Sequence, residues 1–244
     1  MEYKVEPIGL IHSCYREKFG IPRQPGLVKS AQGAIEVLPP CDREEMFKEL
    51  DSFSHIWLQF LFHEAVSDGW RPTVRPPWLG GQKRVGLFAS RSPHRPNFFG
   101  LSVVRYRGLR KEKGKLFLDI SELDLLDGTP ILDIKPYVPY SDKLEGATSG
   151  FVQFAEKQVV VTFASEAESA CQQYQKISGR DLKTLIREVL EQDPRPASQR
   201  HRQREYGMLL WEMNVRWLAE ENSFTVLSVQ EEGRDRKESG SACL

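Results

Sequence analysis

Short apolar runs separated by turn residues dominate the first 140 or so positions of the chain. Alternating, β-branched or aromatic runs predict strands at residues 3–11, 34–38, 55–63, 84–89, 101–109, 115–123 and 131–135. Gly and Pro occur in nearly every gap between these runs and indicate turns. Because helices do not alternate with the strands, the pattern favours a closed antiparallel barrel or a sandwich over a doubly wound sheet.

One helix is expected to interrupt these strands. Asp42 precedes Glu45 by three residues, which is the spacing of a capping box at a helix N-terminus. Met46, Phe47 and Leu50 follow at positions that would form one apolar stripe. The pattern therefore predicts a short amphipathic helix that begins after Asp42.

The second part of the chain mixes helical and strand patterns. We expect a strand at 158–163, a helix from Ser165 to about residue 176, and a second helix at 182–192. Ser165, with Glu168 three residues later, and Asp181 are the expected N-caps. The second helix has one apolar face, which comprises Leu182, Leu185, Ile186, Val189 and Leu190. Residues 206–219 alternate as one long strand, with which 224–229 are expected to pair as a hairpin.

These patterns divide the chain into two domains and a tail. Residues 141–153 are small and polar and indicate a boundary. The expected fold is mainly β: an N-terminal antiparallel β-barrel at 1–145, followed by a smaller α+β domain at 146–230. Residues 231–244 are charged, contain Gly and Ser, and lack an apolar pattern, so we expect a disordered tail.

Composition excludes several classes of protein. The chain has 244 residues and no apolar run long enough to span a membrane. Its N-terminus does not resemble a signal peptide, so a cytoplasmic protein is expected. Four cysteines without a Cys-x-x-Cys pair predict reduced thiols, and no metal site is expected. Phosphate-loop, dinucleotide-binding and serine-hydrolase motifs are also missing from the sequence.

Charge is distributed unevenly along the chain. The formal net charge is zero, yet residues 70–115 contain only one acid, Glu112. The cations of this segment are Arg71, Arg75, Lys83, Arg84, Arg91, Arg95, Arg105, Arg107, Arg110, Lys111, Lys113 and Lys115. A polyanion responds to the local field rather than to the sum, so the segment predicts an anion-binding face. A solvated surface with chance clustering is the alternative.

Four segments contain residue types that often surround a ligand. They are 22–26, 62–64, 70–97 and 124–137, and they are rich in Pro, Gly, Arg, His and Asp. Taken singly, each is also explained by a rigid turn with a salt bridge. Together in one predicted barrel, they indicate the rim of a site built from loops on a rigid scaffold.

These segments resemble the TrmO/TsaA family of tRNA methyltransferases. The matching stretches are Pro22 to Leu27, His55 to His63, Trp70 to Pro77, Gly80 to Gly100, Asp124 to Pro136 and Ile186 to Pro196. One departure is clear: the family has Arg-Pro-Asn-Pro, an aliphatic residue and Gly, where this chain has Arg95 to Gly100 with Phe98 and Phe99.

The resemblance implies a β-barrel that binds S-adenosylmethionine, a homodimer, and an activity. That activity is transfer of a methyl group to N6 of threonylcarbamoyladenosine at position 37 of the tRNA anticodon loop. The resemblance implies cofactor contacts from Gln24, Pro25, Gly26, His63, Glu64, Arg91, Leu101, Asp124, Leu125, Leu126 and Asp127. Arg91 suits the methionine carboxylate, and Asp124 or Asp127 suits the ribose hydroxyls.

The sequence indicates several candidates, and no single residue, for contact with the nucleoside that accepts the methyl group. His63, Glu64, Asn97 and Tyr137 are candidates for assisting proton removal from the acceptor nitrogen. An arginine between Arg91 and Arg95 is expected to bind the threonyl carboxylate.

The basic residues and several aromatic residues are the candidates for contacts with tRNA. The expected phosphate contacts are Arg71, Arg75, Arg95, Arg105, Arg195 and Arg200, together with the rest of the 105–115 cluster. Trp70, Trp78, Phe98 and Phe99 are candidates for base stacking. A non-catalytic RNA-binding barrel and a methyltransferase for another acceptor remain the alternatives.

Overall fold

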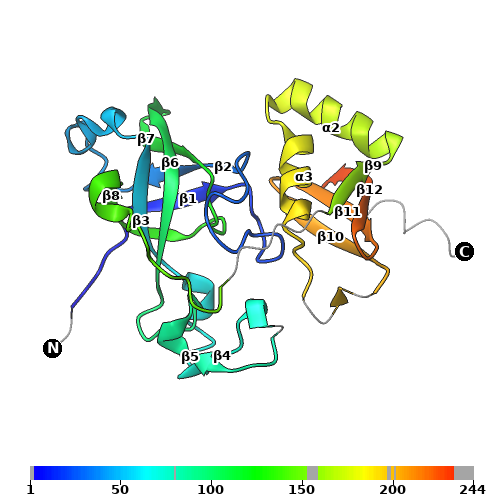
Figure 1. The fold of residues 1–244 in the computed structure, drawn as a ribbon. Helices are drawn as coiled ribbons and strands as arrows, with labels where there is room; N and C mark the ends of the chain where they lie inside the picture. Colours follow the sequence, from blue (N-terminus) through cyan, green and yellow to red (C-terminus); the bar gives the residue numbers. More distant parts are fainter. Residues whose placement is uncertain (1–2, 80, 153–158, 197–198, 201, 234–244) are drawn as a thin grey trace, which may run out of the picture.

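The computed structural model describes residues 3–79, 81–152, 159–196, 199–200 and 202–233 (Figure 1). Six strands of the N-terminal part close into a barrel in the order β1-β2-β7-β6-β3-β8, and β8 pairs with β1. All of these pairings are antiparallel. The strands are β1 (Gly9–Ser13), β2 (Gln32–Val37), β3 (His55–Leu61), β6 (Phe99–Glu112), β7 (Lys115–Ser121) and β8 (Pro130–Pro136). The predicted antiparallel barrel is confirmed.

Every second side chain of a barrel strand points inward, and these side chains fill the barrel interior. In β3, Ile56, Leu58 and Phe60 are buried, whereas Gln59 between the last two is exposed. Successive side chains of a strand point to opposite faces, so a strand with this pattern presents one apolar row to the barrel interior. β6 and β7 follow the same rule and are joined at Lys113 and Gly114, both of which have positive φ. Two such residues form the turn type that matches the twist of a hairpin.

The helix predicted after Asp42 is wrong. Two 3-10 turns occupy the segment instead, Glu44–Phe47 and Leu50–Ser52, and no side chain caps either of them. Glu49 between them has a φ of 66°, which a continuing right-handed helix does not allow. Phe47 and Leu50 still pack against the core, whereas Met46 is exposed, so the predicted apolar stripe was only partly correct.

A two-stranded arm extends from the barrel at the bottom of Figure 1. Its strands are β4 (Thr73–Val74) and β5 (Val85–Gly86), which pair antiparallel. The strand predicted at 84–89 is therefore limited to two residues, and a 3-10 turn, Leu87–Ala89, follows it. A short helix, α1 (Pro139–Asp142), follows β8.

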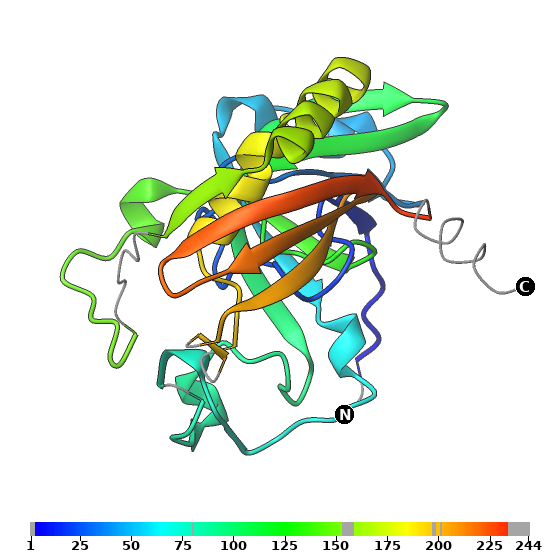
Figure 2. The same ribbon diagram turned by 90° about the vertical axis from the view of Figure 1, so that its right-hand side faces the viewer.

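The C-terminal part is an α+β unit, as predicted. Its four-stranded sheet has the order β10-β11-β12-β9, with β9 parallel to β12 and the other pairs antiparallel. Two helices pack on this sheet, and α3 is the one nearer to the barrel (Figures 1 and 2). The elements are β9 (Val160–Phe163), α2 (Ser165–Ser178), α3 (Leu182–Glu191), β10 (Arg204–Leu210), β11 (Met213–Ala219) and β12 (Ser223–Glu231).

Residues 206–219 form two strands and not the single strand predicted. The chain reverses between Leu210 and Met213, where Trp211 has a φ of 50°. Tyr206 consequently lies opposite Trp217, and their rings stack 5.7 Å apart. The expected pairing of 224–229 with the strand before it is confirmed by β11 and β12.

The two C-terminal helices begin differently. The Asp181 carboxylate accepts from the Thr184 backbone N–H at 3.0 Å and from its hydroxyl at 2.7 Å, so the predicted cap of α3 is confirmed. The predicted cap of α2 is wrong: Ser165 is the first helical residue, Ala164 occupies the cap position, and no side chain caps it.

The loop between β1 and β2, residues 14–31, joins the two domains. The Cys14 carbonyl accepts from the Trp211 N–H at 2.8 Å, and Glu17 accepts from the Leu209 N–H at 3.0 Å. Phe19 stacks on Trp217 with the ring centroids 5.8 Å apart. Farther along the loop, the backbone N–H and the hydroxyl of Ser30 both donate to Glu188 of α3, at 2.8 and 2.7 Å.

Two predicted segments lie partly outside the described residues. β12 extends to Glu231, the first residue of the expected tail, and residues 234–244 lie outside the described part. So do residues 153–158, where the boundary segment ends and the strand before Val160 was expected to begin. Among the described residues, no helix is long and apolar enough to cross a membrane.

The cap of α3 yields a stability prediction. Asp181→Ala should lower the free energy of unfolding by about 1 kcal/mol, because two groups of the first turn lose their acceptor. Ser165→Ala is the matched control at the start of α2, where no capping bond exists, and should change little. Urea unfolding followed by circular dichroism measures both values, and equal losses for the two variants would contradict the assignment.

Candidate functional site

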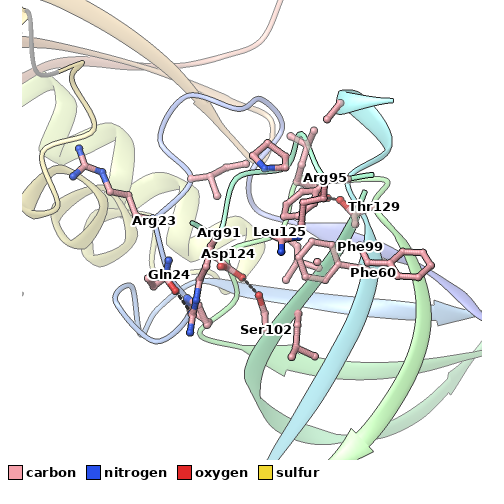
Figure 3. Close-up of a pocket in the computed structure, with 18 of the residues that line it drawn as sticks. Arg23, Gln24, Phe60, Arg91, Arg95, Phe99, Ser102, Asp124, Leu125 and Thr129 are labelled. Carbon is pink, nitrogen blue, oxygen red and sulfur yellow. Dashed lines mark hydrogen bonds between the residues drawn. The ribbon is translucent and has the colours of Figure 1, made fainter. Parts of the chain in front are cut away.

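A cavity of about 890 Å³ lies beside β3 and the first residues of β6 (Figure 3). Five segments form its walls: 21–25 of the interdomain loop, 60–65 at the end of β3, 90–95 after the arm, 99–103 of β6, and 124–126 after β7. Three of the four segments singled out in the sequence therefore contribute here, and the fourth, 70–97, does so through its end. The volume is within the range of small-molecule sites.

Apolar side chains form much of the wall. Phe60, Leu125 and the half-exposed Phe99 and Leu101 line it. Gly100 allows this arrangement, because a Cβ atom there would lie 2.2 Å from the Phe60 ring. The backbone of β6 therefore passes directly against an aromatic side chain. Such walls favour a flat heteroaromatic group over a strongly hydrated one.

The buried carboxylate of Asp124 is one of the polar groups that line the cavity. Asp124 accepts a hydrogen bond from the Ser102 hydroxyl at 2.7 Å (Figure 3). Burial raises the pKa of Asp124 to about 6, against the smaller opposing effects of the Ser102 hydrogen bond and of the Arg91 charge. At neutral pH the group is therefore an anion held in a poorly hydrated place, where it accepts hydrogen bonds strongly.

Arg91 and Gln24 meet at the same end of the cavity. The Arg91 guanidinium donates to the Gln24 side-chain oxygen, which fixes the arginine relative to the interdomain loop. Gln24 and Pro25 line the cavity, whereas Gly26 does not and instead donates its backbone N–H to the Glu122 carbonyl at 2.9 Å. With a φ of 78°, Gly26 turns the loop back toward β2, so its contribution is to the path of the chain.

The candidates for the acceptor side are only partly brought together. His63, Glu64 and Tyr137 line the cavity, and His63 Nε2 lies 4.0 Å from the Glu64 carboxylate. Glu64 also pairs with Lys18 at 3.4 Å. Asn97 is exposed and does not line the cavity.

Asp127 lies outside this cavity, contrary to expectation. It accepts from the Ser13 N–H at 2.8 Å and pairs with Arg16 at 2.8 Å, beside a separate polar cleft. The chain turns at Gly128, three residues before Ile131 of β8, so Asp124 and Asp127 face different sides. Leu125 and Leu126 remain lining residues, as expected.

Several cavity residues were not identified from the sequence, and Ser102 and Arg23 are two of them. Ser102 is buried on β6 at an inward position between apolar neighbours, and a polar residue at such a position was the available signal. Arg23 lies inside the segment 22–26, but its charge alone does not distinguish it from the many other arginines of the chain.

The long basic segment separates into two regions. On β6 and β7, Arg105 pairs with Glu122, Arg110 with Asp119 and Glu112, Lys111 with Glu44, and Lys115 with Glu36. On the arm, Arg71, Arg75, Lys83 and Arg84 are exposed, and none of them has an ion-pair partner among the described residues. Most of the uncompensated positive charge therefore lies on the arm, although Arg107 and Lys113 of the β6–β7 hairpin also have no ion-pair partner among the described residues. Trp70 is exposed beside the arm, whereas the Trp78 side chain lies outside the described part.

The expectation that Arg195 contacts RNA is wrong. The side chain is 1% exposed and donates to Asp193 and to the carbonyls of Glu220 and Glu221. A guanidinium buried in this way cannot reach a phosphate in solvent. Arg200 is more accessible, at 22%, and its Nε lies 3.1 Å from Asp193.

Comparison with known proteins identifies the family. A model of the tRNA-methyltransferase O N-terminal domain matches residues 10–143, and a model of the TrmO C-terminal domain matches residues 156–232. The chain belongs to the TrmO family. The resemblance stated from the sequence is therefore confirmed, and so is the class of cofactor, because relatives are named as S-adenosylmethionine-dependent methyltransferases.

Relatives of the TrmO family match over nearly the whole chain. The tRNA (adenine(37)-N6)-methyltransferase of Escherichia coli is 42% identical over 231 residues, which cover 93% of this chain and 98% of that protein. A putative S-adenosylmethionine-dependent methyltransferase of Pseudomonas aeruginosa is 46% identical and covers 89% and 93%. The crystal structure of TrmO from Pseudomonas aeruginosa superposes with a TM-score of 0.79 at 39% identity, covering 94% and 99%.

The cavity of this TrmO protein fits S-adenosylmethionine in its chemistry. The cofactor has a flat adenine, a ribose diol, and a methionine part that ends in a carboxylate and an amine. The cavity presents aromatic and aliphatic walls, the anionic acceptor Asp124, and the cation Arg91 at one end. The adenine, the ribose and the carboxylate of the cofactor therefore each have a complementary group within one space.

The pKa of Asp124 predicts how cofactor affinity depends on pH. Protonation below pH 6 removes the charge that strengthens its hydrogen bonds. The dissociation constant of S-adenosylmethionine should therefore rise by up to about tenfold from pH 7 to pH 5. Isothermal titration calorimetry across this range measures it.

Two variants control this prediction. Asp124→Asn should bind weakly at every pH. Ser102→Ala should move the pH midpoint upward, because the hydrogen bond that it removes favours the carboxylate. A wild-type affinity that stays constant from pH 5 to pH 7 would rule out an ionised Asp124 as a cofactor ligand.

Proposed function

We propose that this TrmO protein transfers a methyl group from S-adenosylmethionine to N6 of threonylcarbamoyladenosine at position 37 of tRNA. The observation that carries the proposal is the cavity beside β3 and β6, where Asp124 and Arg91 face apolar walls. The names of the relatives support the tRNA substrate and the position, and the family resemblance supplies the threonylcarbamoyl group.

The cofactor brings an already activated methyl group, so the protein has to supply position and electrostatics. Arg91 holds the methionine carboxylate, and its bond to Gln24 limits the rotamers that it can adopt. Asp124 accepts from the ribose hydroxyls while Ser102 orients it. Phe60 and Leu125 cover the adenine. Each group is fixed by a neighbour before the cofactor arrives, which lowers the entropy cost of binding.

Methylation of the acceptor nitrogen requires removal of its proton. The nitrogen lies between a purine ring and a urea carbonyl, which delocalise its lone pair and make its proton more acidic. A modest base is therefore sufficient. His63 is our first candidate, because its imidazole lines the cavity and its Nε2 lies 4.0 Å from the Glu64 carboxylate, which can orient the ring. Tyr137, packed on Trp57 with the ring centroids 5.9 Å apart, is the second.

The arm formed by β4 and β5 is the expected tRNA contact. Its exposed cations suit phosphates, and Trp70, which is 57% exposed, suits an unstacked base of the anticodon loop. The family resemblance further implies a homodimer, and the exposed Phe99 and Leu101 on β6 are the surface that we expect to be covered. Because tRNA is the substrate, we expect the protein to act in the cytoplasm.

The substrate class can be tested directly. Labelled S-adenosylmethionine is given to two tRNA preparations that differ only in the threonylcarbamoyl group, and radioactivity in the nucleic acid is counted. We expect label only in the modified tRNA. Binding of the cofactor without any transfer would favour a non-catalytic module, and equal label in both preparations would favour a different acceptor.

The arm yields a separate prediction for salt dependence. The triple variant Arg71→Gln, Arg75→Gln, Arg84→Gln should reduce the slope of log affinity against log salt concentration by about 0.7–0.9 for each phosphate that the arm no longer neutralises. The double variant Lys111→Gln, Lys115→Gln is the matched control, because both lysines are already paired with acids. Filter binding of tRNA at several salt concentrations measures the slopes. A larger change in the control would place the RNA on the β6–β7 hairpin instead.

A further inference from the structure

The acceptor nucleoside of the proposed reaction brings a second carboxylate to the cavity. Its threonyl group ends in a carboxylate that lies only a few bonds from N6, the atom that receives the methyl group. The cation that binds this carboxylate must therefore line the same cavity as the cofactor. The lysine and the arginines of the lining are Lys18, Arg23, Arg91 and Arg95.

Three of these four cations are engaged or directed elsewhere. Lys18 pairs with the Glu64 carboxylate at 3.4 Å. Arg91 is held by a hydrogen bond at the end of the cavity where the methionine carboxylate is expected. Figure 3 shows the Arg23 guanidinium directed away from Arg91. Arg95 is the remaining arginine of the lining.

One short turn holds the Arg95 guanidinium on two sides. A terminal nitrogen donates to the Ser90 carbonyl at 2.9 Å, and the guanidinium carbon lies 5.7 Å from the centroid of the Phe88 ring. Phe88 belongs to the 3-10 turn Leu87–Ala89, and the hydroxyl and backbone N–H of Ser90 both donate to the Leu87 carbonyl, at 2.7 and 3.0 Å. Both contacts therefore come from one hydrogen-bonded turn, which limits the rotamers of a long side chain before a ligand binds.

A second turn fixes the backbone of Arg95. The Phe98 N–H donates to the Arg95 carbonyl at 3.1 Å, and the Phe98 carbonyl accepts from the Phe62 N–H at 2.8 Å. Phe98 has a φ of 54°, which is unfavourable for a bulky residue and is a kind of strain that often occurs at ligand sites. The turn thereby ties Arg95 to the end of β3, one residue before His63, our first candidate for the base.

The Arg95 guanidinium keeps most of its donors for a ligand. The bond to Ser90 uses one terminal nitrogen, and neither Nε nor the other terminal nitrogen has a hydrogen-bond partner among the described residues. A planar guanidinium with these groups unused matches the two oxygens of a carboxylate. Arg95 also forms no ion pair with the carboxylates of the described residues that line the cavity, which are Glu64, Asp68, Asp124 and Asp142.

We propose that Arg95 binds the threonyl carboxylate of the acceptor nucleoside, and that Phe88 positions Arg95 for this contact. The assignment rests on the proposed function. It divides the two arginines after the arm between the two ligands, with Arg91 on the carboxylate of the cofactor and Arg95 on that of the acceptor. Arg95 is then a residue that selects the modified adenosine, and not a general phosphate contact.

The test compares two anticodon stem-loops. One contains threonylcarbamoyladenosine, and the other contains the same nucleoside with the carboxylate converted to a neutral amide. For the wild-type protein, we expect kcat/KM to be about tenfold to a hundredfold higher with the acid, the range expected for hydrogen bonds to a charged group. In Arg95→Gln, this acid-to-amide ratio should fall toward one, with the affinity for S-adenosylmethionine unchanged.

Further variants separate contact from position. Arg95→Lys keeps the charge but not the planar group, so its ratio should lie between those of the wild type and Arg95→Gln. Phe88→Leu should lower the ratio by about twofold to fivefold, because the guanidinium loses its aromatic support, and Phe88→Tyr should keep the wild-type ratio. Partial unfolding does not change the ratio, because folded enzyme is counted equally for both substrates.

Two other arginines are the controls. Arg187→Gln removes a comparable contact outside the cavity, because this exposed arginine of α3 lies 5.9 Å from the centroid of the Phe163 ring. Its ratio and its cofactor affinity should equal those of the wild type. Arg91→Gln should show the reverse of Arg95→Gln, namely weaker cofactor binding with an unchanged ratio at saturating cofactor.

The remaining outcomes separate this assignment from the proposed function. If the acid and amide rates fall together in Arg95→Gln, the arginine binds phosphate and the assignment is overturned. A wild-type ratio near one overturns it as well, and so does a loss of cofactor affinity in Arg95→Gln. Where turnover of a variant is too slow to measure, the affinities of the two stem-loops, measured by fluorescence anisotropy, give the ratio instead. If the wild-type protein methylates neither stem-loop while still binding the cofactor, the proposed function itself fails.

Discussion

The interdomain loop, residues 14–31, is the element on which the rest of the structure depends. It leaves β1, binds the edge of the C-terminal sheet through Cys14 and Glu17, and returns to the barrel at Gly26. Phe19 between these points is packed in an aromatic stack with Tyr206 and Trp217. A loop of this length on a free surface would lose much conformational entropy on ordering. The packing against the second domain offsets that loss, and the ordered loop then forms one wall of the cavity.

This arrangement couples the two domains to one site. Gln24 and Arg23 are neighbours in the loop, but Gln24 accepts from Arg91 of the barrel, whereas the Arg23 guanidinium is directed away from Arg91. The barrel alone contains Asp124 and Ser102, yet the orientation of Arg91 depends on a residue that the C-terminal domain helps to hold. One segment held by both domains therefore forms a wall of the cavity and fixes Arg91 through Gln24.

Local patterns in the sequence predicted the barrel because each strand obeys a two-residue period. β3 and α3 followed their apolar patterns, and the Asp181 cap was identified from residue type and position alone. The reversal at Trp211 could not be predicted, since no Gly or Pro marks it and the alternation continues across it. The helix after Asp42 failed for the opposite reason: the cap and stripe signals were present, but packing of Phe47 and Leu50 needed only two short turns.

The site was also only partly predictable, because local sequence patterns do not indicate tertiary contacts. Loop segments rich in Pro and Gly indicated the rim of the site, and the family resemblance implied Gln24, Arg91 and Asp124, but neither indicated which side of the chain each side chain faces. Asp127, three residues after Asp124, lies beside another cleft. Arg195 shows the same limit, because its positive charge is visible in the sequence while its burial is a tertiary property.

Charge has to be counted after folding. The stretch 70–115 contains one acid in the sequence, yet strand pairing places Glu36, Glu122 and Asp119 against its second half. After folding, the strongest remaining positive charge is on the arm, because no acidic segment covers it among the described residues. Around Asp193 the segment after α3 carries both signs, and folding places the guanidiniums of Arg195 and Arg200 against one buried carboxylate. Arginines that are alike in the sequence therefore differ after folding: those of the arm are exposed, whereas Arg195 is buried in an ion pair.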